Sequence, residues 1–159
     1  MPAKAIPEGF TSITPHLIIK GAAKALDFYK KAFGAEEVMR LACDQTGALM
    51  HAEIRIGNAV VMLADEFPSM GAISPSTLGG SGVTIHLYVQ DVDAAFKKAV
   101  AAGATGVMPP MDMFWGDRYS KVTDPFGHTW SIATHTRDVT PQECKAAMAA
   151  MMSQPGSCN

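Results

Sequence analysis

The chain has 159 residues, of which 48% are apolar and 18% charged, and its formal net charge is -2. Such a composition is typical of one globular domain that is large enough to bury a core. The charge balance and the lack of any Lys/Arg run longer than a pair exclude an electrostatic nucleic-acid surface, so we expect no nucleic-acid partner.

No apolar run is long enough for a membrane-spanning helix or for the core of a signal peptide. The three cysteines, Cys43, Cys144 and Cys158, are widely spaced and lack the spacing of a metal site. We therefore expect a cytoplasmic protein with no membrane partner and no disulfide framework.

The chain repeats one pattern. A strand-like start at Ile13 leads into an Ala-rich helical stretch that ends at Gly34, and a second start at Val83 leads into a similar stretch that ends at Gly103. Each half continues into a hairpin-like stretch, at 51–65 and at 119–135. Two copies are too few for a solenoid, so we predict one duplicated domain with a cleft where the halves meet.

In the first half, residues 1–10 form a polar lead. Period-two alternation then predicts strands at 11–20, 47–56 and 59–63. Apolar residues at helical spacing predict a helix over 21–33, closed by Gly34, and Gly57-Asn58 is typical of a two-residue hairpin turn. Residues 67–82 are rich in Pro, Gly and Ser, and form a connector long enough to cover a site.

In the second half, alternation predicts a strand over 83–89, followed by a helix whose cap is Asp91 or Asp93. Asp124-Pro125-Phe126-Gly127 is typical of a type I turn. A capping box at 140–143 starts a C-terminal helix within 139–152. Its apolar stripe must pack on the domain or on a second subunit, and we expect 153–159 to be disordered.

Each predicted strand has one apolar face and one more polar face, because successive side chains point to opposite sides. Histidines and a carboxylate gather on the polar faces, at His16, His51, Glu53 and His86. A sheet with one helix-covered face and one concave face of mixed polarity is a ligand-binding arrangement.

Several short sequence motifs resemble those of a known family. They include Ala25-Leu26-Asp27-Phe28-Tyr29, His51-Ala52-Glu53, Phe114-Trp115-Gly116-Asp117-Arg118-Tyr119 and Asp124-Pro125-Phe126-Gly127-His128-Thr129-Trp130. In this order they resemble the glyoxalase/bleomycin-resistance/dioxygenase (vicinal oxygen chelate) superfamily, and within it the uncharacterised PhnB-like branch.

The resemblance covers about residues 11–138, and it implies a single α+β domain of paired βαβββ modules. Module one would span about 11–66 and module two about 83–138. The curved, mostly antiparallel sheet would form a half-barrel cleft with helices outside, usually in a homodimer.

The resemblance also places the four metal-ligand positions of the family's enzymes at Thr14, Met62, Thr84 and Ser131. None of these side chains is a good ligand for a divalent transition metal. We therefore expect no metal and no cofactor. The alternative is a displaced site for zinc or iron(II) at His16, His86 and Glu53, whose side chains are of the right type.

His51 and Glu53 are also candidates for a general acid/base pair, against the simpler interpretation that they are polar lining of the cleft. Trp115 and Arg118 match a stretch that helps to form the ligand groove of the family's bleomycin-binding members. The residues that we expect to contact a ligand are Thr14, His16, His51, Glu53, Met62, Thr84, His86, Tyr88, Trp115, Arg118 and Ser131.

Two functions are compatible with these residues. The first is a metal-independent small-molecule-binding protein of the resistance or sequestration type, expected to be a homodimer. The second is a metal-dependent lyase, isomerase or dioxygenase that uses the displaced site. The sequence does not decide whether the protein is an enzyme.

Overall fold

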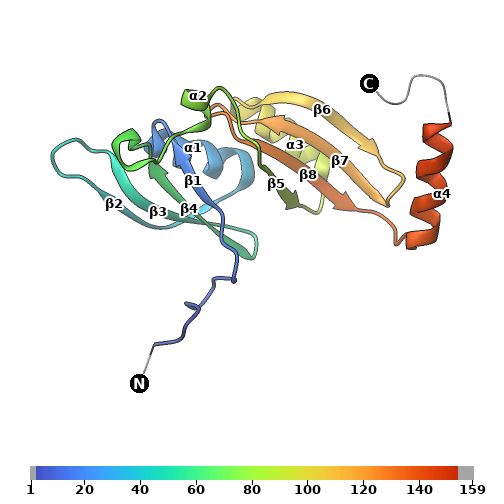
Figure 1. Ribbon diagram of the computed structural model, residues 1–159, viewed down its shortest axis with the longest axis horizontal. Helices are drawn as coiled ribbons and strands as arrows, with labels where there is room; N and C mark the ends of the chain where they lie inside the picture. The colour runs from blue at the N-terminus through green and yellow to red at the C-terminus, as the bar shows by residue number, and fades with distance from the viewer. Residues whose placement is uncertain (1–2, 154–159) are drawn as a thin grey trace.

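Two four-stranded sheets, each made by one βαβββ module, build the protein (Figure 1). The computed structural model describes residues 3–153. The first module consists of β1 (His16–Ile19), α1 (Ala22–Phe33), β2 (Glu36–Ala42), β3 (Leu49–Ile56) and β4 (Ala59–Asp65). The second consists of β5 (Thr84–Tyr88), α3 (Val92–Ala102), β6 (Thr105–Asp112), β7 (Asp117–Thr123) and β8 (Thr129–His135).

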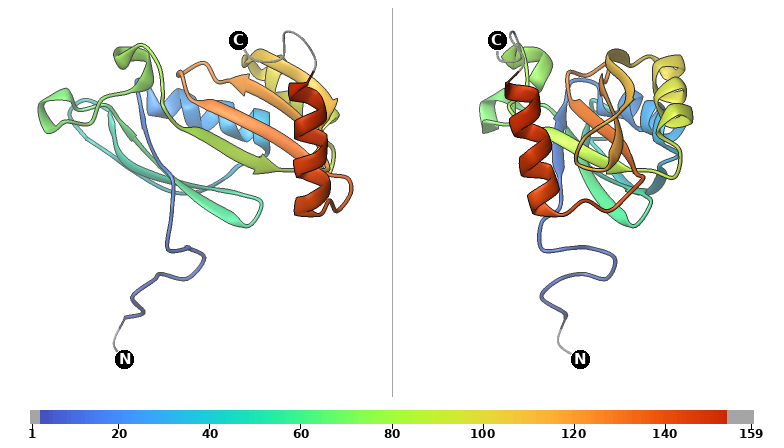
Figure 2. Two further views of the ribbon diagram at one scale, coloured as in Figure 1. Left: turned by 45° about the vertical axis from the view of Figure 1, so that its right-hand side comes forward. Right: turned by 90° about the vertical axis from the view of Figure 1, so that its right-hand side faces the viewer.

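The two sheets have equivalent topologies, with strand orders β1-β4-β3-β2 and β5-β8-β7-β6. In each sheet the first pair of strands is parallel and the other pairs are antiparallel. The predicted α+β class and the duplication are thus confirmed. Helices α1 and α3 pack against each other on one side of the sheets (Figure 2).

Local sequence signals explain where these elements begin and end. Gly34 ends α1 at a φ of 66°, a left-handed conformation that glycine adopts without strain. The cap of α3 is Asp91, whose carboxylate accepts a hydrogen bond from the Ala94 N–H at 3.0 Å. Gly57 and Asn58 connect β3 to β4, as the turn signal predicts.

Three strands differ from what the alternation of apolar and polar residues in the sequence predicts. The first strand begins only at His16, because Pro15 has no N–H to donate to a ladder. The edge strands β2 and β6 show no alternation of buried and exposed residues, so alternation alone did not reveal them. They follow only from the module that the family resemblance implies.

The connector contains two short helices, η1 (Pro68–Met70) and α2 (Pro75–Leu78). The Glu66 carboxylate orders this segment. It accepts hydrogen bonds from the Ser74 N–H at 3.1 Å, from the Ser74 hydroxyl at 2.7 Å and from the Thr77 hydroxyl at 2.8 Å. The connector is therefore held against the end of the first module.

The C-terminal helix α4 (Pro141–Met152) stands apart from both modules (Figure 1). The predicted capping box is present, with reciprocal hydrogen bonds between Thr140 and Glu143. None of the helix residues is buried, and Met148 and Met151 are each 53% exposed. The stripe therefore does not pack on the domain within this chain.

The expectation of a disordered tail falls mostly on residues 154–159, which lie outside the described residues. None of the described helices is long and apolar enough to cross a membrane.

An aromatic cluster with a buried carboxylate joins the two modules. Trp130 is 1% exposed, and its ring lies 5.5 Å from that of Tyr29 on α1. Asp124, also buried, accepts hydrogen bonds from the Tyr29 hydroxyl at 2.7 Å and from the Trp130 indole N–H at 3.0 Å. Burial and the Asp124 carboxylate raise the pKa of Tyr29 well above its ordinary value, so this hydroxyl remains a donor.

We expect Tyr29→Phe to lower the free energy of unfolding by about 1–3 kcal/mol, because a buried carboxylate loses a donor that it cannot replace with water. Chemical denaturation with urea measures this change. The control is Tyr119→Phe on β7, whose hydroxyl makes no hydrogen bond to any residue of the described part of the chain. Equal stabilities of the two variants would contradict the role assigned to the Tyr29–Asp124 contact.

Candidate functional site

Each sheet has a face turned away from α1 and α3, which we call its open face. Strand register defines both faces. On the first open face, Met62 lies between His16 on β1 and Glu53 on β3. On the second open face, Ser131 lies beside His86, and Ala133 lies between Tyr88 and Tyr119.

The first open face carries a hydrogen-bonded pair of ionisable side chains. The Nε2 atom of His51 lies 3.0 Å from Oε1 of Glu53, so the two residues do interact directly. The ring of His16 lies 6.1 Å from that of His51. Partial burial, and then the charge of His51, lower the pKa of His16 below its ordinary value.

The predicted contact residues Thr14, Glu53 and Met62 lie together at one end of this face. They line a hollow of about 410 Å³, whose other walls include Ile6 and Phe10 of the N-terminal lead. Acidic, apolar and hydroxyl groups therefore meet in one place, as a binding site for an organic molecule requires.

The second open face is aromatic. The ring of His86 contacts that of Tyr88 edge-on at 4.5 Å and is nearly parallel to that of Tyr119 at 6.1 Å. Trp115, from the loop before β7, meets Tyr119 edge-on at 5.8 Å. The Nδ1 atom of His86 is hydrogen-bonded to the Ser131 hydroxyl at 2.7 Å, which fixes the orientation of the imidazole.

A buried carboxylate, that of Asp117, is hydrogen-bonded to two of these aromatic side chains. Asp117 accepts hydrogen bonds from the Tyr88 hydroxyl and the Trp115 indole N–H, both at 3.1 Å. Its other oxygen lies 2.8 Å from Nδ1 of His135. Hydrogen bonds to Asp117, and then to Asp138, raise the pKa of His135 above its ordinary value.

Tyr119, Asp117 and His135 were not predicted as members of this group. Asp117 and Tyr119 lie in the motif Phe114-Trp115-Gly116-Asp117-Arg118-Tyr119, which was the available signal. Only the register of β7 against β8, which sets Tyr119 beside Ala133 and Asp117 beside His135, shows that they share the face of Tyr88.

Arg118 is placed away from the other predicted contact residues. It precedes Ser120 and Val122 on the core-facing side of β7, and its guanidinium forms two hydrogen bonds to Asp93 of α3, at 2.6 and 2.9 Å. A third hydrogen bond reaches Asp112. This arrangement anchors α3 to its sheet and does not present the guanidinium on an open face.

The side chains at the four positions that the resemblance aligns with the family's metal ligands do not suit a metal ion. Thr14 and Thr84 offer hydroxyls, Met62 a thioether, and the Ser131 hydroxyl is engaged by His86. For the displaced set, His16 and Glu53 lie on the first sheet and His86 on the second. Across residues 3–153, no three or more His, Cys, Asp or Glu side chains are grouped so as to hold a metal ion.

Comparisons with known proteins agree with this fold. Residues 11–132 match the model of the Glyoxalase/Bleomycin resistance protein/Dioxygenase superfamily. An uncharacterized protein of Mycobacterium bovis, Mb0911c, is 48% identical over 142 residues, which cover 87% of this chain and 93% of that protein.

Solved structures extend the comparison. TioX from Micromonospora sp. ML1 has a TM-score of 0.61 at 28% identity, over 79% of this chain and 98% of that one. The PhnB protein of Bacillus cereus has a TM-score of 0.60 at 19% identity, over 78% and 99% of the two chains, which is a likeness of fold alone. The chain belongs to the glyoxalase/bleomycin resistance protein/dioxygenase superfamily.

The shifted pKa values of His135 and His16 make the stability of the fold depend on pH in opposite directions. We expect NMR titration to show His135 deprotonating above pH 6.5 and His16 below it. The raised pKa of His135 contributes stability that is present below pH 6.5 and is lost as the pH rises through the raised value. The lowered pKa of His16 contributes a loss of stability as the pH falls below 6.5.

Paired variants check the causes of these shifts. Asp117→Asn should lower the pKa of His135 more than Asp138→Asn does, because Asp117 is the stronger partner. His51→Gln should raise the pKa of His16 only in part, because burial is the larger cause. If His16 and His135 titrated at the same pH, the different environments assigned to them would be contradicted.

Proposed function

We propose that this member of the glyoxalase/bleomycin resistance protein/dioxygenase superfamily binds a small organic molecule on its open faces without a metal ion, as a protein of the sequestration or resistance type. One observation carries the proposal. The positions where the family's enzymes hold a metal are occupied here by two threonines, a methionine and a serine, at Thr14, Met62, Thr84 and Ser131.

The chemistry of the two faces supports a planar aromatic ligand with a polar or cationic group. His86, Tyr88, Trp115 and Tyr119 offer flat rings on the second open face. The first open face supplies the carboxylate of Glu53 and the imidazole of His51, which pair at 3.0 Å. Rings that stack on a ligand and a few fixed polar groups that orient it are the usual composition of a small-molecule site.

A second copy of the chain completes the proposed site. The open faces bear exposed apolar side chains, among them Met39 and Leu41 on β2 and Met111 on β6. A homodimer that places the first open face of one protomer against the second open face of its partner would cover these side chains. It would also enclose the ligand between the His51–Glu53 pair and the aromatic rings.

Metal independence is tested by elemental analysis of protein purified without added metal or chelator, followed by a thermal-shift screen against aromatic antibiotics and aldehyde–thiol adducts. We expect no stoichiometric metal, and we expect a binding compound to raise Tm equally with and without EDTA. Stoichiometric zinc, iron or manganese would favour the metal-dependent lyase, isomerase or dioxygenase. A screen in which no compound raises Tm would remove the main support of the binding proposal.

The dimer is tested by sedimentation equilibrium. We expect the mass of two chains, and we expect Leu41→Lys to give the mass of one, since it places a charge on a side chain that is 55% exposed and would be covered. Val100→Lys on α3, where the native side chain is 40% exposed on the helix side, is the control and should stay dimeric. A wild-type mass of one chain, or equal behaviour of the variants, would overturn the arrangement.

A further inference from the structure

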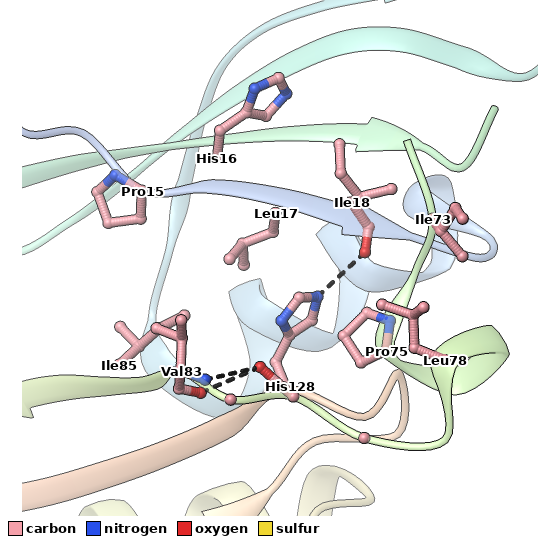
Figure 3. A pocket seen from close by; sticks show the side chains of 13 residues that line it. Pro15, His16, Leu17, Ile18, Ile73, Pro75, Leu78, Val83, Ile85 and His128 are labelled. Atoms are coloured by element: carbon pink, nitrogen blue, oxygen red, sulfur yellow. Dashed lines mark hydrogen bonds between the residues drawn. The ribbon is translucent and has the colours of Figure 1, made fainter. Parts of the chain in front are cut away.

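We propose that the protein has a second small-molecule site, separate from the open faces, in the cavity between the two modules beneath the connector. The cavity has a volume of about 430 Å³ and lies between the edge strands β1 and β5 (Figure 3). Its walls are mainly apolar, from both modules and the connector, and include Ile18, Ile73, Pro75, Val83 and Ile85. Of the open-face residues named above, only His16 also lines it.

Among the described residues, the imidazole of His128 points into this apolar cavity, whereas the ring of His16 at its edge is turned away from His128 (Figure 3). His128 is 8% exposed, and its Nε2 atom lies 3.2 Å from the carbonyl oxygen of Ile18. A carbonyl oxygen only accepts, so Nε2 carries the hydrogen and donates it. In the neutral imidazole the other nitrogen, Nδ1, is then an acceptor. Nδ1 faces the cavity, and no residue of the described range donates to it (Figure 3).

The backbone that carries the imidazole is fixed on both sides. The backbone N–H of His128 donates to the Asp124 carboxylate, and the backbone N–H of Asp124 donates to the His128 carbonyl oxygen, each at 2.9 Å. The same carboxylate is fixed by Tyr29 and Trp130 in the core. The ring itself is oriented by its hydrogen bond to Ile18. The Nδ1 acceptor is therefore preorganised, and a ligand does not have to order it.

The lining defines the class of ligand. Within residues 3–153, no Asp, Glu, Lys or Arg side chain lines the cavity, so a charged molecule would lose its hydration without compensation. The Ser81 hydroxyl is engaged by the backbone of Val83, at 3.2 Å both to the N–H and to the carbonyl oxygen. The site therefore selects a neutral apolar molecule, about the size of a bicyclic aromatic, with one hydroxyl or N–H group that donates to His128.

A matched pair of probes tests the single polar contact. We expect 2-naphthol to bind about tenfold more tightly than 2-methoxynaphthalene, which has the same rings but no donor. In NMR spectra, 2-naphthol should shift the methyl resonances of Ile18, Val83 and Ile85, and should move the ¹⁵N resonance of His128 Nδ1 upfield. Equal affinity of the two probes, or an unmoved Nδ1 resonance, would overturn the assigned contact.

A cavity-filling variant tests the location without touching His128. A Cβ added at Gly82 meets no atom within 4 Å, and Gly82 lines the cavity without a positive φ, so the backbone accepts a larger residue there. We expect the ring of Gly82→Phe to occupy the cavity. We expect this variant to abolish 2-naphthol binding. The control, Ala23→Phe, adds the same ring to an exposed position of α1 and should leave binding unchanged.

The two proposals fail separately. Shifts confined to Met62, Met111 and Tyr119 on the open faces, with binding intact in Gly82→Phe, would overturn the second site and leave the proposed function standing. Loss of 2-naphthol binding in Gly82→Phe would support the second site, regardless of what the open faces bind.

Discussion

The buried carboxylate of Asp124 is the contact on which the arrangement of this protein depends. One of its oxygens accepts the backbone N–H groups of Phe126 and His128, and the other accepts the hydroxyl of Tyr29 and the indole N–H of Trp130. A buried charge is tolerated only when its hydrogen-bonding capacity is satisfied. Here the donors come from both modules, so the carboxylate is satisfied only when the modules are docked in this one way.

Much of the functional geometry follows from that docking. Because α1 and α3 meet each other, the modules join through their helical sides, and both open faces remain available on the other side of the molecule. The turn that Asp124 organises also carries His128, whose Nε2 reaches Ile18 across the gap between the edge strands β1 and β5. The same turn therefore joins the modules and places an acceptor in the cavity between them. The duplication thus yields two kinds of concavity, one on the sheet faces and one at the junction of the modules.

Individual residues show how far sequence reasoning reached. His51 and Glu53 share a strand face by alternation, and the structure places them in contact at 3.0 Å. Arg118 satisfied the same kind of motif argument, yet it lies on the core-facing side of its strand, where two aspartates bind it. Tyr119 is its direct neighbour on the open face. A sequence motif locates the region of a site, but a shift of one residue along a strand moves a side chain to the opposite face.

The sequence by itself determined the duplication, the α+β class, the caps and turns, and the residue types at Thr14, Met62, Thr84 and Ser131. These features depend on residue type, on short-range periodicity or on matching motifs, all of which can be read along one chain. Only the tertiary structure decided that Asp117 gathers Tyr88, Trp115 and His135, that no residue of α4 is buried against the described part of its chain, and that His128 points into a cavity. Each of these results depends on strand register or on the docking of distant segments, and neither leaves a periodic signal in the sequence.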